Sequence, residues 1–374
     1  MMRRPSYSRI RRVLIYRLAS LGDTVVSLPC FHAIERTFPR ARRMLLTVAA
    51  EGKRTFAMSL LEGTGLVDGA IGYPLGTRRV GELLAVRERI VDFGPDILFY
   101  FFARPKSYHT LVRDWTFFRL CGITRMVGLP FHPRLRRYRR DRGGGRYEHV
   151  AEYMGRCIGR GVDVDVSAPR NWDLRLGEEE RQSVRERLGG LEGIPFLAFS
   201  PGTKMPVKDW GRDNWLELVD RMGARYPAVG AAFLGVEAER ERCEALTRRW
   251  SGPSVNLAGE LDVRRCACLI SRARLFVGHD SGPMHLASAV QTPAVAIFTA
   301  RAKPGLWFPY PNGVRHEVLY RGQPCSECGL VKDCPHGKRC IASIRVEDVV
   351  RAIEKQRRRY WPDGGTPCRV NVRM

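Results

Sequence analysis

Short apolar runs alternate with segments of helical periodicity along most of the chain. In the first half, four apolar runs of strand length are each followed by a segment in which apolar residues recur at helical spacing. The predicted strands are residues 13–16, 44–48, 70–73 and 96–102. The predicted helices are residues 24–36, 55–61, 79–91 and 108–121. Strands that alternate with helices in this order predict a parallel α/β sheet.

The same alternation returns in the second half, after a polar, glycine-rich stretch at residues 139–146. Helices are predicted at residues 148–160 and 178–188 and from near Asp213, Glu237, Asp262 and Ser281, and strands at residues 196–200, 229–234, 275–278 and 295–298. We therefore predict two α/β domains, residues 1–175 and 176–355, followed by a basic tail at 356–374. Because ligands bind such sheets at the carboxyl ends of the strands, one crevice is expected to collect Asp23, Thr203, Gly235 and Asp280.

Length and composition fit a two-domain protein without a membrane span. The chain has 374 residues with 44% hydrophobic content, enough for two cores of ordinary size. The longest weakly polar run, residues 285–300, is interrupted by Gln291, Thr292 and Pro293. The apolar stretch after the N-terminal arginines is only of strand length, which excludes a signal peptide. We expect a cytoplasmic protein, with attachment to the inner membrane surface as an open alternative.

The formal net charge of +24 suits an anionic partner, since clustered cations bind phosphate by releasing counterions. Most of the basic residues are arginines and few are lysines. This ratio indicates a proteome-wide use of arginine in place of lysine more than it indicates a nucleic-acid site. Residues 134–142 hold six arginines but lack the interleaved aromatic residues of a single-strand platform. We interpret this segment as a solvated loop, an acceptor-facing patch or a membrane-surface patch, and we expect no nucleic-acid partner.

Seven of the eleven cysteines are scattered along the chain and are interpreted as reduced thiols. The other four, Cys325, Cys328, Cys334 and Cys340, lie within sixteen residues. Only one pair of them has the short spacing of a zinc-binding arm. A structural zinc site, disulfides and plain thiols therefore remain alternatives for this segment, and no other metal is expected.

A polar turn at residues 278–287 separates an apolar run from the start of a small-residue helix. Asp280 or Ser281 can cap this helix, Gly282 lets a ligand approach the backbone closely, and Pro283 suits the first turn. The free N–H groups at such a helix start form a phosphate site. A merely well-capped helix would account for these residues but would leave His285 unexplained.

Three motifs in this order resemble glycosyltransferase family 9, the ADP-heptose:lipopolysaccharide heptosyltransferases. They are residues 17–23 with Leu28-Pro29, residues 200–203 with 208–210, and residues 280–285. The resemblance extends from about residue 13 to residue 353. It implies a GT-B fold with two facing Rossmann-like domains and an interdomain cleft, the N-terminal domain binding the acceptor and the C-terminal domain the nucleotide sugar. It also implies an inverting, metal-independent transfer of heptose from ADP-heptose to a lipopolysaccharide inner-core acceptor, without a cofactor.

The predicted catalytic residue is Asp23, whose carboxylate can take the proton of an acceptor hydroxyl. An N-cap for a helix starting at Thr24 is the alternative role for Asp23. The departing diphosphate needs donors in place of a cation. We expect them from Thr203, Lys204, Lys208 and the N–H groups around Asp280, Ser281 and Gly282. A solvated surface charge is the alternative for Lys208.

Glu239 is the candidate for the ribose hydroxyls, with Glu237 and Glu241 as alternatives. The resemblance places Gly259 beside the adenine. His285 either contacts a phosphate or braces Asp280.

Acceptor phosphates are expected to bind Arg54, Arg104 and Lys106, which could instead be solvated charges. The pair Asp163 and Asp165 matches a metal-binding Asp-x-Asp, but it does not follow a central strand, so we predict no metal there. Two other functions stay open. One is transfer from another nucleotide sugar or to another glycan, and the other is non-enzymatic binding of polyanions, in which case Asp23 and Lys208 would be incidental.

Overall fold

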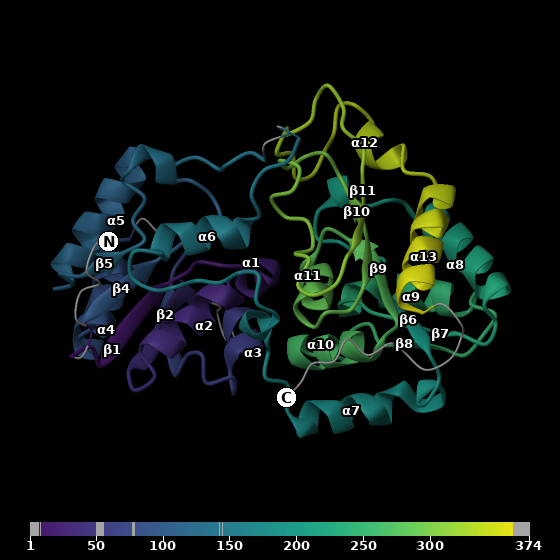
Figure 1. The fold of residues 1–374 in the computed structure, drawn as a ribbon, viewed down its shortest axis with the longest axis horizontal. Coiled ribbons are helices and arrows are strands. Elements are labelled where there is room, and N and C mark those ends of the chain that lie inside the picture. Colours follow the sequence, from purple (N-terminus) through teal and green to yellow (C-terminus); the bar gives the residue numbers. More distant parts are fainter. Residues whose placement is uncertain are drawn as a thin grey trace. The chain divides into compact units, whose positions relative to one another are not determined.

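The chain folds into two compact α/β units, Met1–Leu174 and Arg175–Met374 (Figure 1). The computed structural model describes residues 7, 9–49, 56–76, 79–141, 143 and 145–361. Each unit is built on one sheet whose strands all run parallel, as the alternating pattern predicted.

The first sheet has the order β3-β2-β1-β4-β5. Its strands are β1 (Arg12–Tyr16), β2 (Arg42–Val48), β3 (Gly69–Tyr73), β4 (Ile97–Tyr100) and β5 (Met126–Val127). The central strands β1 and β4 are almost wholly buried because helices cover both faces of a parallel sheet. Their carboxyl ends are therefore the places where polar side chains can be presented at one edge.

The helices of the first unit are α1 (Leu21–Val25), α2 (Leu28–Thr37), α3 (Phe56–Leu61), α4 (Val80–Phe93), α5 (Tyr108–Leu120) and α6 (Val150–Ile158). The single helix predicted over residues 24–36 is wrong, since α1 and α2 are separate. Pro29 lies in the first turn of α2, where its missing N–H costs nothing, whereas inside a longer helix its ring would clash with a preceding carbonyl. The Ser27 hydroxyl donates to the Asp23 carbonyl at 2.6 Å and occupies the break.

The second sheet has the order β11-β10-β9-β6-β7-β8. Its strands are β6 (Phe196–Ser200), β7 (Gly230–Phe233), β8 (Ser254–Asn256), β9 (Leu275–His279), β10 (Ala294–Phe298) and β11 (Glu317–Tyr320). The four inner strands are buried throughout, and they are the four that the apolar runs predicted. The edge strands β8 and β11 are only half-buried and were not predicted.

The helices of the second unit are α7 (Glu178–Leu188), α8 (Arg212–Arg225), α9 (Arg240–Thr247), α10 (Val263–Arg272), α11 (Gly282–Ala289), α12 (Arg339–Ala342) and α13 (Val346–Tyr360). Residues 356–360, predicted as the start of a basic tail, form the end of α13 instead. The rest of that predicted tail, residues 362–374, lies outside the described residues.

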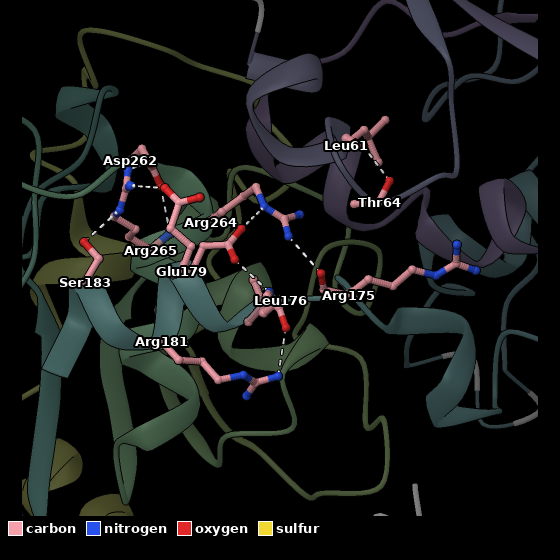
Figure 2. Close-up of polar contacts among 12 residues, drawn as sticks. Leu61, Thr64, Arg175, Leu176, Glu179, Arg181, Ser183, Asp262, Arg264 and Arg265 are labelled. Carbon is pink, nitrogen blue, oxygen red and sulfur yellow. Dashed lines mark hydrogen bonds and ion pairs between the residues drawn. The ribbon is translucent and has the colours of Figure 1, made fainter.

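Polar contacts join α7 to α10 (Figure 2). Arg265 Nε of α10 donates to the Ser183 hydroxyl of α7 at 2.9 Å, and Arg264 Nη2 donates to the Arg175 carbonyl at 2.9 Å. In the same region Arg181 Nη2 donates to the Leu176 carbonyl at 2.8 Å. The Arg265–Ser183 bond links α10 to α7, and the other two bonds hold the segment that leads into α7.

Among the residues that the structure describes, every helix is too short or too polar to cross a bilayer.

Candidate active site

Asp23 lies in the first turn of α1, just beyond the carboxyl end of β1. Its Oδ2 accepts hydrogen bonds from the Ser20 hydroxyl at 2.6 Å and from the Ser20 N–H at 3.2 Å. Its Oδ1 lies 3.5 Å from Arg17 Nη2, and the side chain is 28% exposed. The carboxylate is thus held in one orientation yet can be reached from solvent. The N-cap alternative for Asp23 is wrong, because Ser20 is the N-cap of α1.

The buried side chain of Arg17 stabilises this turn by hydrogen bonds. Its side chain is only 2% exposed, its Nε donates to the Ser27 hydroxyl at 2.9 Å, and its Nη2 donates to the Asp23 carbonyl at 3.0 Å. Burial lowers the pKa of Arg17, and the nearby Asp23 carboxylate opposes that shift. A buried guanidinium therefore fixes both the backbone and the side chain of Asp23.

In the second unit, Lys208 and Asp280 form a buried ion pair. Strands β6 and β9 are neighbours, and the two residues follow their carboxyl ends. Lys208 Nζ lies 2.6 Å from Asp280 Oδ2 and donates to the Asp280 carbonyl at 2.9 Å. Their side chains are 12% and 8% exposed. The alternative that Lys208 is a solvated surface charge is therefore wrong.

The two residues after Lys208 anchor the same loop. Asp209 receives both terminal nitrogens of Arg242, which lies on α9, at 3.2 and 2.9 Å. Arg242 also donates to the Pro201 carbonyl at 3.1 Å. Burial alone would raise the pKa of Asp209, but hydrogen bonds from Arg242 and the Gly211 N–H hold it below its ordinary value. Trp210 donates its indole N–H to the Ile344 carbonyl at 2.7 Å.

His279, the last residue of β9, joins this loop to the turn after β6. Its Nε2 accepts from the Trp210 N–H at 3.1 Å, so its Nδ1 carries the proton and donates to the Gly202 carbonyl at 3.3 Å. The ring is fully buried, and burial lowers the pKa of His279 to about 4. Sequence reasoning missed both His279 and Arg242, although they position the predicted residues. The only sequence signal was that His279 directly precedes Asp280.

Glu239 lies against the glycines that follow β6 and β7. A Cβ at Gly202 would lie 1.9 Å from Glu239 Oε1, and a Cβ at Gly235 would lie 2.7 Å from Oε2. Only glycine at these positions leaves room for the carboxylate. Glu239 lies in a 3-10 helix, Glu237–Glu239, that precedes α9.

The alternative ribose ligand Glu237 also lies at this edge, beside Gly259. A Cβ at Gly259 would lie 2.0 Å from Glu237 Oε2, and its φ of +82° favours glycine. Glu241 is exposed on α9. The structure therefore places Glu239 and Glu237, but not Glu241, against the loops predicted to hold the nucleotide.

The start of α11 matches the predicted phosphate turn in outline. Ser281 is the N-cap, with Gly282 and Pro283 in the first turn. Of the two predicted capping residues, Ser281 therefore takes the N-cap position; its hydroxyl donates to the His279 carbonyl at 3.3 Å and not to the helix start. His285 is buried inside α11, with its ring centroid 6.1 Å from that of Trp307.

The remaining donor-side candidates lie in the turn after β6. Thr203 is half-buried and its hydroxyl accepts the Met205 N–H at 3.3 Å, while Lys204 is exposed.

The acceptor candidates differ in their surroundings. Arg54 lies outside the described residues, and Arg104 is exposed. Lys106 Nζ lies 3.5 Å from the centroid of the Phe102 ring and 3.8 Å from Asp114 Oδ2, and burial lowers the pKa of Lys106. Lys106 is therefore not a simple solvated charge.

The four late cysteines, Cys325, Cys328, Cys334 and Cys340, are free thiols. Within the described ranges, no group of three or more His, Cys, Asp or Glu side chains is placed to hold a metal ion. Asp165 Oδ1 accepts the N–H groups of Ser167 and Ala168 at 3.0 and 3.2 Å, so that carboxylate stabilises a turn.

Comparison with known proteins decides the family. The model of "Glycosyltransferase family 9 (heptosyltransferase)" matches residues 146–336. The chain is 33% identical over 341 residues to lipopolysaccharide heptosyltransferase 1 of Pseudomonas aeruginosa, which covers 87% of this chain and 88% of that protein. The chain belongs to glycosyltransferase family 9. It is an enzyme of the glycosyltransferase class, as the three motifs predicted.

Solved structures of family 9 proteins show the same fold. The glycosyl transferase family 9 protein of Veillonella parvula matches with a TM-score of 0.69 at 17% identity, covering 92% of this chain and 97% of that one. The ADP-heptose lps heptosyltransferase II of E. coli matches with a TM-score of 0.63 at 17% identity, covering 92% and 98%. The predicted GT-B fold, with its parallel α/β sheets, is confirmed.

Proposed function

We propose that this family 9 enzyme transfers a heptose from ADP-heptose to an inner-core sugar of lipopolysaccharide, with inversion and without a metal. The observation that carries this proposal is the relative from Pseudomonas aeruginosa, a lipopolysaccharide heptosyltransferase that matches nearly the whole chain. The donor is supported by the name of the E. coli structure, which specifies ADP-heptose. The geometry of the predicted site residues supports the chemical roles proposed below.

Asp23 is the proposed general base. A general base accepts the proton of the attacking hydroxyl while that oxygen bonds to the anomeric carbon. Ser20 donates both of its N–H and O–H groups to Oδ2, which leaves Oδ1 as the oxygen with more free acceptor capacity. A single carboxylate acting on one face of the sugar gives inversion, because the diphosphate leaves from the opposite face.

The leaving diphosphate is proposed to bind the second unit. An ammonium group has three N–H donors, and two of those of Lys208 go to Asp280. The third is proposed to donate to a phosphate oxygen, together with Thr203, Lys204 and the N–H groups at Ser281 and Gly282. These fixed donors would take the place of a divalent cation. His285 is proposed to support the same helix start.

The nucleoside is proposed to bind beside β7 and β8. Glu239 would accept the ribose hydroxyls, with Glu237 as the alternative, and Gly259 would lie beside the adenine. The close packing of both carboxylates against glycine backbone places their oxygens at the turns that would hold the nucleoside, which supports a role for either in binding the ribose hydroxyls.

The first domain, residues 1–175, is proposed to bind the acceptor and the second, residues 176–355, the nucleotide sugar. An anionic glycolipid suits Arg104, Lys106 and Arg54, because phosphates need fixed cations to orient them. Such an acceptor implies a cytoplasmic enzyme that works at the inner membrane surface. No nucleic-acid partner is proposed.

The test is a transfer assay with the full chain and a panel of nucleotide sugars on heptose-free lipopolysaccharide, read by mass spectrometry. The proposal predicts one heptose added from ADP-heptose, and none or little added from UDP- or GDP-sugars. Addition from a different nucleotide sugar, or binding without transfer from any of them, would overturn the proposed substrate.

A further inference from the structure

We infer that the outer face of α5 and the arginine loop beside it form a docking surface for an anionic lipid bilayer. The α5 surface consists of Tyr108, Val112, Trp115 and Phe131. The arginine loop is residues 132–140. Neither contains the residues proposed to bind the donor, or Arg54, Arg104 and Lys106 of the proposed acceptor site. Of the three interpretations of the arginine segment, the inference takes the membrane surface, and it does not depend on which sugar the enzyme transfers.

The α5 surface is apolar and open to solvent. Tyr108 is 54% exposed, Val112 39%, Trp115 43% and Phe131 36%. The first three follow each other at i, i+4 and i+7, which places them on one stripe of the helix. The ring of Phe131 packs edge-on against Tyr108 with centroids 6.0 Å apart. The stripe therefore continues from α5 to the residue where the arginine loop begins.

Aromatic and aliphatic side chains in one exposed stripe suit the boundary between lipid headgroups and acyl chains. Trp, Tyr and Phe favour that boundary because each combines a large apolar ring with a polar or polarisable edge. At the far end of the stripe the Arg119 guanidinium lies 5.9 Å from the Trp115 ring. An arginine in that place can reach phosphates while its stem covers apolar surface.

The charge around the stripe is strongly positive. Residues 101–140 contain ten Lys and Arg side chains and one acidic side chain, Asp114. Asp114 is buried and already accepts from Tyr100 at 2.6 Å and from Arg113 at 2.7 Å. Arg136 is half-buried, but Arg119, Arg125, Arg134, Arg137, Arg139 and Arg140 are exposed. These exposed arginines present their charge to solvent, and an anionic surface is the complementary partner.

The backbone of the arginine loop is held by side chains of α6. Arg156 donates to the carbonyls of Arg134 and Arg137 at 2.9 and 3.0 Å, and the Tyr153 hydroxyl donates to the Leu135 carbonyl at 3.0 Å. Within this fixed backbone, Arg134, Arg137 and Arg139 are exposed. These three bonds order the loop backbone before any partner binds. A docking surface whose backbone is already ordered loses less conformational entropy on binding, which strengthens the binding.

The test is co-sedimentation of the full chain with phosphatidylcholine vesicles, with and without phosphatidylglycerol. We expect binding only to vesicles that contain phosphatidylglycerol, and weaker binding at high salt. The triple variant R134Q/R137Q/R139Q should bind about a hundredfold more weakly, at roughly fivefold per arginine near an anionic surface. The matched control R212Q/R248Q/R358Q, which removes three exposed arginines of the second unit, should bind as the wild type does.

The apolar α5 surface is tested by substitutions to serine, with a matched control in the second unit. Val112→Ser should weaken vesicle binding by roughly threefold or more, and Trp115→Ser by more than that, whereas Val331→Ser, at a valine 48% exposed in the second unit, should leave it unchanged. Thermal unfolding of each variant shows that it is folded. Equal binding of the triple variant and its control, or equal binding to both vesicle types, would overturn the inference.

If the triple variant R134Q/R137Q/R139Q lost binding to random oligonucleotides but still bound vesicles as the wild type does, the surface would be assigned to nucleic acid. That result would also overturn the inference. Transfer to a delipidated acceptor in solution tests the proposed function separately, since that reaction needs no bilayer. Absent transfer with intact vesicle binding would refute the function and leave the docking surface standing.

Discussion

At the scale of single residues, the proposed donor site depends on how Asp280 holds Lys208. Two contacts from one residue orient the ammonium group, and both side chains are largely buried. Removing the cation from a buried pair leaves an uncompensated carboxylate, which costs about 3–5 kcal/mol.

Lys208→Ala should therefore lower the free energy of unfolding by that order and also weaken ADP-heptose binding by about 1.5–3 kcal/mol, the value of a charged hydrogen bond. Urea unfolding and calorimetric titration with ADP measure the two effects. Lys204→Ala is the control, because Lys204 is exposed and its loss leaves no buried carboxylate unpaired, so the free energy of unfolding should fall far less than in Lys208→Ala. Unchanged stability and unchanged ADP affinity in Lys208→Ala would contradict the placement of this pair in the donor site.

Ser20→Ala tests whether the Asp23 carboxylate must be held in place. The Ser20 hydroxyl donates to Asp23 Oδ2 at 2.6 Å, and a hydrogen bond to a charged group is worth about 1.5–3 kcal/mol. We expect kcat to fall by about tenfold or more while KM for ADP-heptose stays the same, with recovery in Ser20→Thr. In an Asp23→Asn background the same change should have little further effect. A full loss in that background would show that Ser20 acts independently of Asp23.

Sequence alone could place Asp23, Lys208 and Asp280 beyond the carboxyl ends of strands, where the structure has them, because each ionisable residue follows an apolar run. It could not predict Arg242 and His279. Arg242 is one of 55 arginines, and its partner Asp209 lies 33 residues away in the sequence. His279 ends an apolar run, and its partner Trp210 lies 69 residues away. Nothing in the neighbouring sequence identifies either partner. Burial and pairing across the sheet are properties of the fold.

At the scale of elements, the inner strands were predictable because a strand buried on both faces is a continuous apolar run. The edge strands β8 and β11 are half-buried and mixed in composition, so they resemble loops in the sequence. The division between α1 and α2 was marked by Pro29, but Pro29 alone fits a helix start as well as a kink. The Ser27 hydroxyl bond to the Asp23 carbonyl supplies the missing part and is visible only in three dimensions.

The connection between β9 and the loop after β6 depends on a neutral His279, which predicts a pH dependence of stability. Burial lowers its pKa from 6.5 to about 4 in the folded chain. Between these values the unfolded chain binds a proton that the folded chain does not, so protonation favours unfolding. The stabilisation is complete above pH 6.5 and declines as pH falls toward 4. His316 is buried with the same shift and adds to the effect.

His279→Gln should reduce the slope of unfolding free energy against pH in that window by about 1.4 kcal/mol per pH unit, the value for one proton. Urea titrations at a series of pH values, followed by tryptophan fluorescence, measure the slope. His336→Gln, at an exposed histidine of the same unit, should leave it as in the wild type. Carboxylates with lowered pKa, such as Asp209 and Asp348, lose their stabilisation at still lower pH. An unaltered slope in His279→Gln would contradict the neutral, buried histidine.

At the scale of the whole molecule, two α/β units with the fold of family 9 enzymes carry one predicted reaction. Fixed N–H and ammonium donors in the second unit replace a cation in the proposed chemistry, so excess EDTA should leave the transfer rate intact over a short assay. Activity that is lost and then restored by magnesium or manganese would contradict the metal-independent mechanism. Restoration by zinc alone would instead point to Cys325, Cys328, Cys334 and Cys340 as a structural site.

Whether Asp23 is the general base is tested by the turnover of Asp23→Asn with ADP-heptose and a heptose-free lipopolysaccharide acceptor, measured beside the affinity of the variant for ADP. Asparagine keeps the size of the side chain and can still accept from Ser20, but it cannot take the acceptor proton. We expect kcat to fall by about 10²- to 10⁴-fold, the range of a general-base contribution, while ADP affinity is nearly unchanged. Turnover close to that of the wild type would show that Asp23 is not the base.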